Sequence, residues 1–390
     1  MSDALRPGAV RQRRHLVSGT SQAHPGVAGL DPISHRNVGF QPLPPPIGLA
    51  PYRYELASSF AEIAQRITHD GTMVFHVLGD SGGVKDAEFQ SWVADQLAAD
   101  LNGPSAPQFC YHVGDVVYFT GARDDYYAQF YEPYEHYAPP IFSIPGNHDG
   151  EVDDPSAQTS LDGWAAYFMQ KTPDVDPISK DAPRVGLNLP NPYWTLVTPL
   201  ATFVGLYTNV PEHGSIDSIQ QQWFTHEIAS ADPDKALIVA LHHPVYSFDV
   251  HHSGSARMAD VLENAIRDTG RVPNLVLSGH VHDFQLIEKE IVPGTKTPFI
   301  VSGNGGYHNL HALHSDFGTQ DEATGATLIA GNDKAWGYVT LTVARGPGQG
   351  ELDISGHPTF IDRAGTVTRG APFSYTGACL TLPAGQAVNL

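Results

Sequence analysis

Residues 108–118 read QFCYHVGDVVY. The run QFCYHV is mostly apolar and predicts a buried β-strand, and Gly114 permits a tight turn that leaves Asp115 at the strand end. Tyr118 follows three residues after this carboxylate. A tyrosine at this point either packs against the strand end or belongs to a site built around Asp115. The choice depends on what the other predicted strands carry at their ends.

Four further apolar runs end in the same way. They are TMVFHVL from residue 72, PIFSI from 140, ALIVAL from 236 and NLVLS from 274. Each leads directly into side chains that can bind a metal ion, namely Asp80, Asn147, His148, His242, His280 and His282. In open α/β sheets, ligands bind beyond the carboxyl ends of the strands. The pattern therefore predicts an α/β fold with one site on one rim.

Composition limits the partners of the chain. Its 390 residues are 41% hydrophobic and carry a formal net charge of −20, which opposes binding to nucleic acid or to an anionic membrane. Apolar runs fall short of the ~20 residues that a membrane span needs. We therefore expect a globular protein that binds neither nucleic acid nor membranes, whose oligomeric state the sequence does not indicate. An anionic substrate requires a concentrated positive centre, such as metal ions.

Two segments stand apart from the strand pattern. Residues 1–50 are rich in Pro and Gly and are predicted to form an arm, held by Leu43, Ile47 and Leu49, before a catalytic domain over 51–390. Arg11-Gln-Arg-Arg14 resembles a twin-arginine export signal, but no continuous apolar run follows it, so we expect a cytoplasmic protein. The Pro/Asp-rich insertion at about 150–190 is either a surface excursion or a lid over the rim.

The side chains at the strand ends suit a dinuclear metal site. Carboxylate, amide, imidazole and phenolate donors together fit a mixed pair, such as iron with zinc, manganese or a second iron. Two neighbouring cations can hold a phosphoryl group and activate a water molecule for attack. One carboxylate has to bridge both ions, and Asp115 is the candidate.

The order of these motifs resembles the calcineurin-like metallophosphoesterase superfamily and, within it, the purple acid phosphatases. The resemblance rests on Asp80-Ser-Gly82, Gly114-Asp115-Val-Val-Tyr118, Gly146-Asn147-His148-Asp149, Val239-Ala-Leu-His242 and Gly279-His280-Val-His282. Most of the superfamily has a histidine ligand where this chain has Gly82. In purple acid phosphatases the replacement is a tyrosine three residues after the bridging aspartate, which is where Tyr118 stands.

The resemblance implies a fold, a metal pair and a set of site residues. The fold is a four-layer αββα sandwich of two mixed β-sheets flanked by helices. Fe(III) is assigned Asp80, Asp115, Tyr118 and His282, and a divalent ion (Fe, Zn or Mn) is assigned Asp115, Asn147, His242 and His280. His148 and the pair His251-His252 are the predicted catalytic residues that contact phosphate or the leaving oxygen. His243, His308, His311 and His314 are interpreted as structural.

The resemblance also implies a reaction. A metal-bound hydroxide would hydrolyse a small phosphorylated substrate, most simply a phosphate monoester. A phosphodiesterase that uses the same metals is the alternative, and pocket shape distinguishes the two better than motifs do. A non-catalytic scaffold that retains the fold is the third hypothesis. A scaffold of this kind would be expected to have lost some of the metal-ligand residues, whereas this sequence retains every residue that the resemblance assigns as a ligand.

Overall fold

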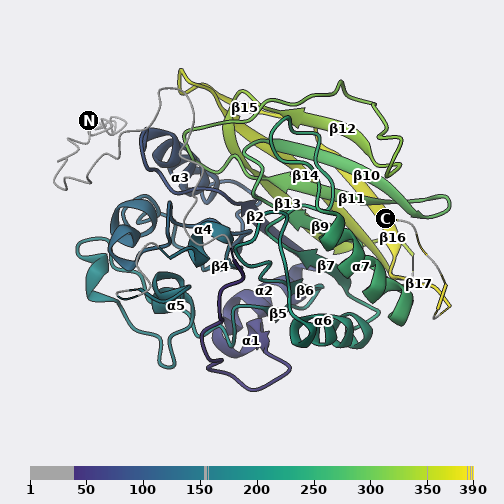
Figure 1. Ribbon diagram of the computed structural model, residues 1–390, viewed down its shortest axis with the longest axis horizontal. Helices are drawn as coiled ribbons and strands as arrows, with labels where there is room; N and C mark the ends of the chain where they lie inside the picture. Colours follow the sequence, from purple (N-terminus) through teal and green to yellow (C-terminus); the bar gives the residue numbers. More distant parts are fainter. Residues whose placement is uncertain are drawn as a thin grey trace, which may run out of the picture. The chain divides into compact units, whose positions relative to one another are not determined.

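Two mixed β-sheets form the centre of the computed structural model (Figure 1). The structure describes residues 39–152, 156, 158–348, 350–383, 385, 386, 388 and 390. The larger sheet has eight strands in the order β1-β5-β6-β7-β9-β11-β10-β12. The smaller has seven, in the order β15-β14-β13-β2-β3-β4, with β16 beside β14. The arginine motif at 11–14 and most of the predicted arm lie outside the described residues, so the domain division at residue 50 stays a prediction.

The strands have the following bounds. The eight-stranded sheet contains β1 (Arg53–Glu55), β5 (Trp194–Val197), β6 (Ala201–Gly205), β7 (Ala236–Ala240), β9 (Leu275–Ser278), β10 (Phe284–Val292), β11 (Thr295–Ser302) and β12 (Thr327–Asn332). The seven-stranded sheet contains β2 (Thr72–Leu78), β3 (Phe109–His112), β4 (Ile141–Ser143), β13 (Trp336–Arg345), β14 (Glu351–Ile361), β15 (Val367–Arg369) and β16 (Phe373–Ala378). A separate pair joins β8 (Arg271–Val272) and β17 (Leu380–Thr381).

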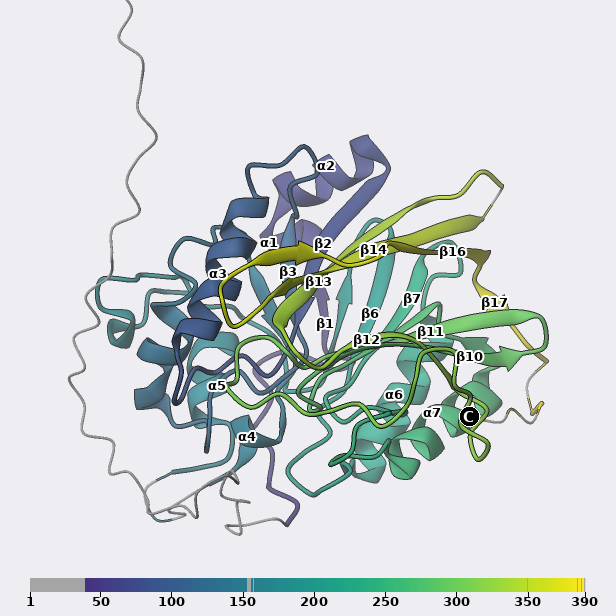
Figure 2. The same cartoon turned by 90° about the horizontal axis from the view of Figure 1, so that it is seen from above.

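The described chain contains helices of very different length. They are α1 (Leu56–Ser59), α2 (Ala61–Asp70), α3 (Glu88–Asp100), α4 (Asn147–Gly150), α5 (Asp162–Phe168), α6 (Ser218–Ser230) and α7 (Ala256–Thr269), with the short turns η1 (Arg123–Asp125), η2 (Tyr127–Tyr131) and η3 (Pro177–Ser179). Figure 2 shows α2 and α3 beside the sheet of β2 and β13, and α6 and α7 beside the sheet of β6 and β7. The predicted αββα arrangement is confirmed. Along the described chain, every helix is too short or too polar to cross a membrane.

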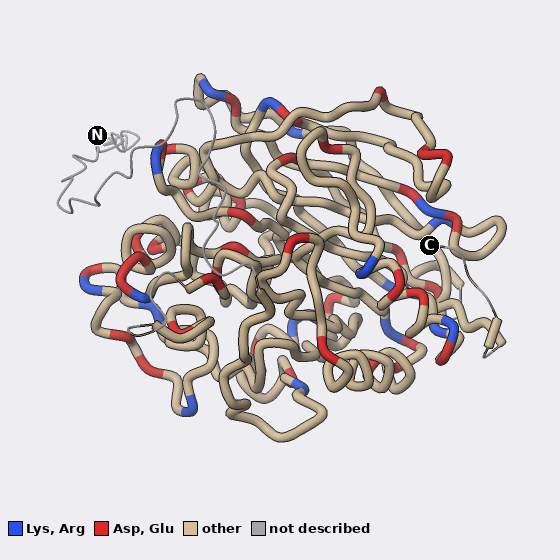
Figure 3. Tube along the Cα trace, viewed as in Figure 1, with Lys and Arg blue, Asp and Glu red and all other residues tan. Residues whose placement is uncertain are grey.

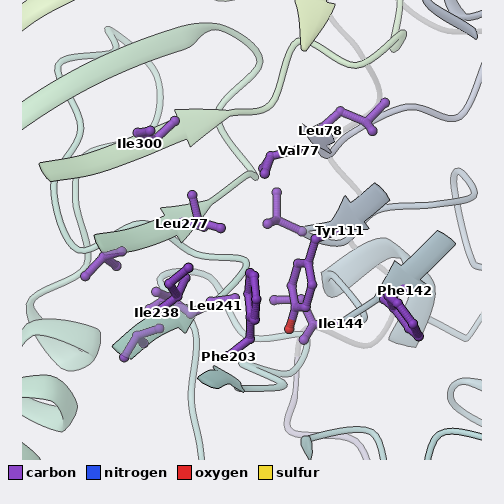
Figure 4. Packing of buried hydrophobic residues seen from close by; sticks show 14 of the residues in the cluster. Val77, Leu78, Tyr111, Phe142, Ile144, Phe203, Ile238, Leu241, Leu277 and Ile300 are labelled. Atoms are coloured by element: carbon purple, nitrogen blue, oxygen red, sulfur yellow. The ribbon is translucent and has the colours of Figure 1, made fainter. Parts of the chain in front are cut away.

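Aromatic side chains fill the space between the two sheets. The ring of Phe203, on β6, lies 5.2 Å from the ring of Phe75 on β2 and 5.2 Å from the ring of Tyr111 on β3. Figure 4 shows Tyr111 and Phe203 side by side at the centre of this cluster. All three side chains are fully buried. Truncating such a ring costs about 3–5 kcal/mol, so this contact fixes the position of one sheet against the other.

Strand direction brings the predicted motifs to one edge. β2, β3 and β4 are parallel neighbours, with Leu78 beside His112 and His112 beside Ser143. β6, β7 and β9 are also parallel neighbours in the other sheet. Parallel strands end at a common edge, so the loops that follow them are brought together.

Parts of the predicted arm and of the 150–190 insertion pack against the core. Trp164 and Phe168 on α5 are fully buried with stacked rings, so this part of the 150–190 insertion belongs to the core. At the end of the predicted arm, the backbone N–H groups of residues 47 and 48 donate to the Pro190 carbonyl oxygen at 3.0 Å. Leu43 and Ile47 pack against the core as expected. Leu49 does not, because 91% of it is exposed.

Candidate metal centre

The seven predicted ligands meet at the rim of the two sheets. The seven-stranded sheet supplies Asp80 after β2, Asp115 and Tyr118 after β3, and Asn147 after β4. The eight-stranded sheet supplies His242 after β7, and His280 and His282 after β9. All seven are buried. Their donor atoms form two groups that share one carboxylate.

The first group, the Tyr118 cluster, consists of Asp80, Asp115, Tyr118 and His282. The Tyr118 hydroxyl lies 3.1 Å from Asp80 Oδ1, 3.0 Å from Asp115 Oδ2 and 3.2 Å from His282 Nε2. His282 Nε2 is 3.5 Å from Asp80 Oδ1. The phenol has one proton and faces three atoms that can accept it.

The second group, the Asn147 cluster, consists of Asp115, Asn147, His242 and His280. Asn147 Oδ1 lies 3.1 Å from His242 Nε2 and 3.0 Å from His280 Nδ1. Asp115 Oδ2, the oxygen that faces Tyr118, is also 3.4 Å from His242 Nε2. Asp115 therefore stands between the two clusters, where a bridging carboxylate is required.

This convergence of lone pairs fits cations. His242 Nδ1 lies 2.9 Å from the Val113 carbonyl oxygen, and His282 Nδ1 lies 3.0 Å from the Asn309 carbonyl oxygen. Each Nδ1–H can donate to that oxygen, which leaves the lone pair of the neutral ring on Nε2, inside the cluster. These lone pairs face carboxylate and amide oxygens, which are acceptors as well. A cation coordinates all of them at once, so the residues present suit a dinuclear site.

Electrostatics set the protonation states that a cation meets. Burial raises the pKa of the Tyr118 phenol well above its ordinary value, and Asp115 and Asp80 add to this effect. The oxygen therefore becomes a phenolate only next to a strong positive charge. Burial lowers the pKa of His242, but Asp115 and Asp80 together raise it to about 9. A metal ion at this position has to compete with that proton.

Gln129 and Tyr118 leave no space for a side chain at position 82. A Cβ atom there would lie 2.4 Å from Gln129 Oε1 and 2.9 Å from the Tyr118 ring. Gln129 is itself fixed, because its Oε1 accepts from the Tyr118 backbone N–H at 2.9 Å and its Nε2 donates to the Tyr118 carbonyl at 2.7 Å. A histidine at position 82 and a tyrosine at position 118 would therefore compete for one space.

Backbone geometry aims the carboxylates into the site. Asp80, Asp115 and His280 have φ angles of 57°, 54° and 67°, the left-handed region that non-glycine residues seldom adopt. The Asp149 carboxylate supports this turn by accepting hydrogen bonds from the backbone N–H groups of residues 116, 117 and 146. Burial and the neighbouring Asp115 raise the pKa of Asp149 to about 7. Backbone strain at several strand ends is typical of functional sites.

Comparison with known proteins identifies the family. Residues 73–284, more than half of the chain, match the family described as calcineurin-like phosphoesterase. The chain belongs to this family. Members of this family typically bind a dinuclear metal centre, and the carboxylate and imidazole groups of Asp80, Asp115 and His242 lie close enough together to be a candidate metal site. No curated protein sequence matches the chain.

Two solved structures are similar to this calcineurin-like phosphoesterase. A purple acid phosphatase from yellow lupin (Lupinus luteus) seeds has a TM-score of 0.53 and 17% identity, over 79% of this chain and 54% of that one. GAP50, described as the anchor in the inner membrane complex of Plasmodium, has a TM-score of 0.51 and 15% identity, over 80% of this chain and 90% of that one. The chain thus spans about half the length of the lupin phosphatase. Both likenesses show the fold.

His148 lies beside the Tyr118 cluster of this phosphoesterase. Its backbone N–H donates to Asp115 Oδ1 at 2.9 Å, and its ring centre is 4.5 Å from that of Tyr118. Its Nδ1 lies 2.8 Å from the Phe119 carbonyl oxygen, to which Nδ1–H can donate. Burial lowers the pKa of His148, but Asp115 and Glu151 raise it above its ordinary value. The ring is therefore held in place and favours the protonated state.

The predicted pair His251-His252 also lies near the clusters. Asp249 Oδ1 accepts hydrogen bonds from both backbone N–H groups at 2.6 Å. The His252 ring centre is 4.7 Å from that of His280. The His251 ring centre is 5.1 Å from that of His311. The structure thus brings His252 to the Asn147 cluster and places His251 one ring further away.

Sequence reasoning missed two neighbours of the site. Glu212 Oε1 lies 3.2 Å from His252 Nδ1 and 4.0 Å from His280 Nε2. His311, interpreted as structural, has its ring centre 4.5 Å from that of His282 and 5.2 Å from that of His252. His311 had a weak signal, because it follows the glycine-rich loop 303–306. Glu212 had none, because it stands in a loop without a motif.

Three further histidines were interpreted as structural, namely His243, His308 and His314, and this interpretation stays a prediction. His243 Nδ1 lies 2.7 Å from Thr208 Oγ1, although the His243 ring is also 4.3 Å from that of His280. His308 lies beside Tyr307 with the two rings tilted, their centres 4.4 Å apart. His314 packs against Phe248 at 5.8 Å. These three have packing partners that explain their positions.

Proposed function

We propose that this chain hydrolyses phosphate monoesters with two metal ions at the rim, as purple acid phosphatases do. The observation that carries the proposal is the steric exchange between positions 82 and 118. Gln129 and the Tyr118 ring fill the space that a side chain at position 82 would need, and the hydroxyl of that ring reaches the carboxylates of Asp80 and Asp115. A phenolate donor here supports iron as one of the two metals.

The two clusters divide the metal ions between them. We assign Fe(III) to the Tyr118 cluster, because carboxylates and a phenolate are hard, negatively charged donors. We assign a divalent ion to the Asn147 cluster, because its amide and imidazole donors are neutral. When bound, the two cations supply Lewis-acid stabilisation of the phosphoryl group and an activated water molecule.

The protein itself positions the substrate and a proton. With Nδ1–H of His148 donating to the Phe119 carbonyl, Nε2 is the nitrogen that can give a proton to the leaving oxygen. His252 stands beside the Asn147 cluster as a donor to phosphoryl oxygens. Figure 3 shows Lys and Arg scattered along the described chain. The contacts cited above for the two clusters involve imidazoles and no Lys or Arg, so we assign the positive charge of the site to imidazoles and metal ions.

A substrate pair tests the proposal. Protein loaded with defined metals would be assayed with p-nitrophenyl phosphate and with bis-p-nitrophenyl phosphate. Faster hydrolysis of the monoester supports the proposal, whereas preference for the diester assigns the site to phosphodiester hydrolysis. Hydrolysis of neither would favour a role such as that of GAP50, which shares the fold and is described as an anchor. The full donor set at the rim supports the enzyme.

A further inference from the structure

The three histidines of the two clusters differ in what their outward-facing nitrogen meets. For His242 and His282 this nitrogen is Nδ1, and each lies within 3.0 Å of a backbone carbonyl oxygen. His280 is reversed, because its Nδ1 faces Asn147 Oδ1 at 3.0 Å and its Nε2 points outward. The group near this Nε2 is a carboxylate, Glu212 Oε1, at 4.0 Å. One ligand histidine thus faces a full negative charge, and the other two face neutral carbonyls.

Glu212 Oε1 also contacts His252, the candidate substrate contact beside the Asn147 cluster. Glu212 Oε1 lies 3.2 Å from His252 Nδ1, which is hydrogen-bonding distance. At 4.0 Å its interaction with His280 is electrostatic. The His252 and His280 ring centres are 4.7 Å apart. Glu212 therefore stands between a candidate metal ligand and a candidate substrate contact.

The loop between β6 and α6 fixes the position of Glu212. The backbone N–H of Gly214 donates to the Pro211 carbonyl at 2.8 Å, and that of Ser215 donates to the Thr208 carbonyl at 2.7 Å. The Ser255 hydroxyl, at the start of α7, donates to the His213 carbonyl. The Glu212 side chain is 59% exposed, so these loop contacts, and not burial, place the carboxylate.

We propose that Glu212 is a positioning residue that couples His252 to His280. Its charge keeps the His280 proton on Nε2, so that the Nδ1 lone pair points at the divalent ion and binds it more strongly. Its contact with His252 Nδ1 fixes the orientation of that ring, which leaves the Nε2 side for a phosphoryl oxygen. The second effect rests on the proposed phosphatase function, whereas the first requires only that the Asn147 cluster binds a metal.

Metal affinity tests the first effect. We would measure the dissociation constant of the divalent ion by chelator competition for wild type, Glu212→Gln and Glu212→Ala. Outer-sphere partners contribute about 10–100-fold to metal affinity, and solvent screens this exposed carboxylate, so we expect about tenfold weaker binding in Glu212→Ala. The affinity of Glu212→Gln for the divalent ion should lie between those of wild type and Glu212→Ala, because glutamine keeps an oxygen acceptor but loses the charge.

A control variant and the iron content distinguish a specific effect of Glu212 on the divalent site from a general loss of metal binding. Glu62→Gln removes an exposed carboxylate on α2 and should keep wild-type affinity for the divalent ion. Iron retention should be unchanged in all variants, because the candidate ligand near Glu212 is His280 of the Asn147 cluster. Wild-type affinity for the divalent ion in both Glu212 variants would overturn the proposal, as would equal loss of both metals.

Binding of inorganic phosphate to the metal-loaded protein tests the second effect. Glu212→Ala and His252→Ala should each weaken it, and the double variant should bind phosphate no more weakly than His252→Ala alone, because Glu212 acts through His252. Additive losses would overturn the coupling. If wild type hydrolyses no phosphoester, the proposed function fails, but the metal measurement still decides the role of Glu212 at His280.

Discussion

The two halves of the metal centre differ in charge although they share a carboxylate. The Tyr118 cluster has two carboxylates and a phenol that can ionise, with one imidazole. The Asn147 cluster has the shared Asp115 carboxylate, a neutral amide and two imidazoles. Each cluster can therefore prefer a different cation, the more highly charged one going to the Tyr118 cluster. Variants of Asn147 and of Tyr118 each act on one half and leave the other half as the reference.

The largest effect is expected from Asn147→Ala. It removes the amide oxygen that lies within 3.1 Å of both His242 and His280, so the divalent ion should be lost first. Turnover should fall to background, because both cations are needed for the proposed reaction. Elemental analysis after dialysis would show iron retained. Equal retention of both metals with normal turnover would mean that Asn147 is not a ligand.

His148→Ala should lower kcat by roughly 10²–10⁴, the usual contribution of acid–base assistance. Metal content should not change, because His148 contacts Asp115 only through its backbone N–H, which the variant keeps. His226→Ala, on the exposed side of α6, is the matched control and should keep wild-type kcat. Loss of metal in the His148 variant would instead place its imidazole among the ligands.

The strand-end residues could be predicted because parallel strands impose their geometry. Once β2, β3 and β4 pair in parallel, residues such as Asp80, Asp115 and Asn147 share an edge whatever the intervening chain does. The exchange between Gly82 and Tyr118 was also predictable, because it is a local departure from a known pattern. The roles assigned to these residues stay predictions.

Loop residues were not predictable by the same reasoning. Glu212 reaches His252 and His280 because hydrogen bonds within its loop and one from Ser255 fix the turn, and no periodicity encodes such contacts. His311 depends on a long loop between β11 and β12. Leu49 was expected to be buried because it is apolar, but its neighbours satisfy the backbone contacts at Pro190 and leave it in solvent.

Tyr118→Phe changes the Tyr118 cluster and leaves the donors of the Asn147 cluster in place. A phenolate bound to Fe(III) should give aerobically purified, iron-loaded protein a visible absorption band, and the variant should lose it while keeping the ring that packs beside Gly82. Iron should bind more weakly by at least the ~10–100-fold that a supporting group contributes, because Gly82 offers no replacement donor. Absorption spectra and iron content after dialysis measure both effects.

A stacked neighbour provides the control for this variant. Tyr307 lies with its ring centre 4.2 Å from that of Tyr118, and Tyr307→Phe should keep the visible band. If iron-loaded wild type is colourless, or Tyr118→Phe keeps the band, the purple acid phosphatase assignment fails. Membership of the calcineurin-like phosphoesterase family does not depend on this result.

The smallest effect concerns a buried imidazole beneath the Tyr118 cluster. His112, the last residue of β3, accepts at Nδ1 from the Gly114 N–H at 3.2 Å, so its proton lies on Nε2, which donates to Ser81 Oγ at 2.8 Å. It thereby ties the loop of Asp80 to the loop of Asp115. Burial lowers the pKa of His112 to about 3, although Asp115 opposes this shift. Protonation would break the bond to Gly114.

This pKa predicts a loss of stability in acid. An unfolded histidine has a pKa of about 6.5, so between pH 6.5 and about 3 the unfolded chain binds more protons at this position than the folded one. His112 therefore stabilises the fold fully above pH 6.5, and this contribution falls by up to about 1.4 kcal/mol per pH unit as the pH drops toward 3. Urea unfolding of metal-free protein at pH 7 and pH 5 would measure it. His112→Gln should lower stability at both pH values but show a smaller difference between them, since glutamine does not titrate, and an equal difference in both proteins would mean that other groups cause the acid sensitivity.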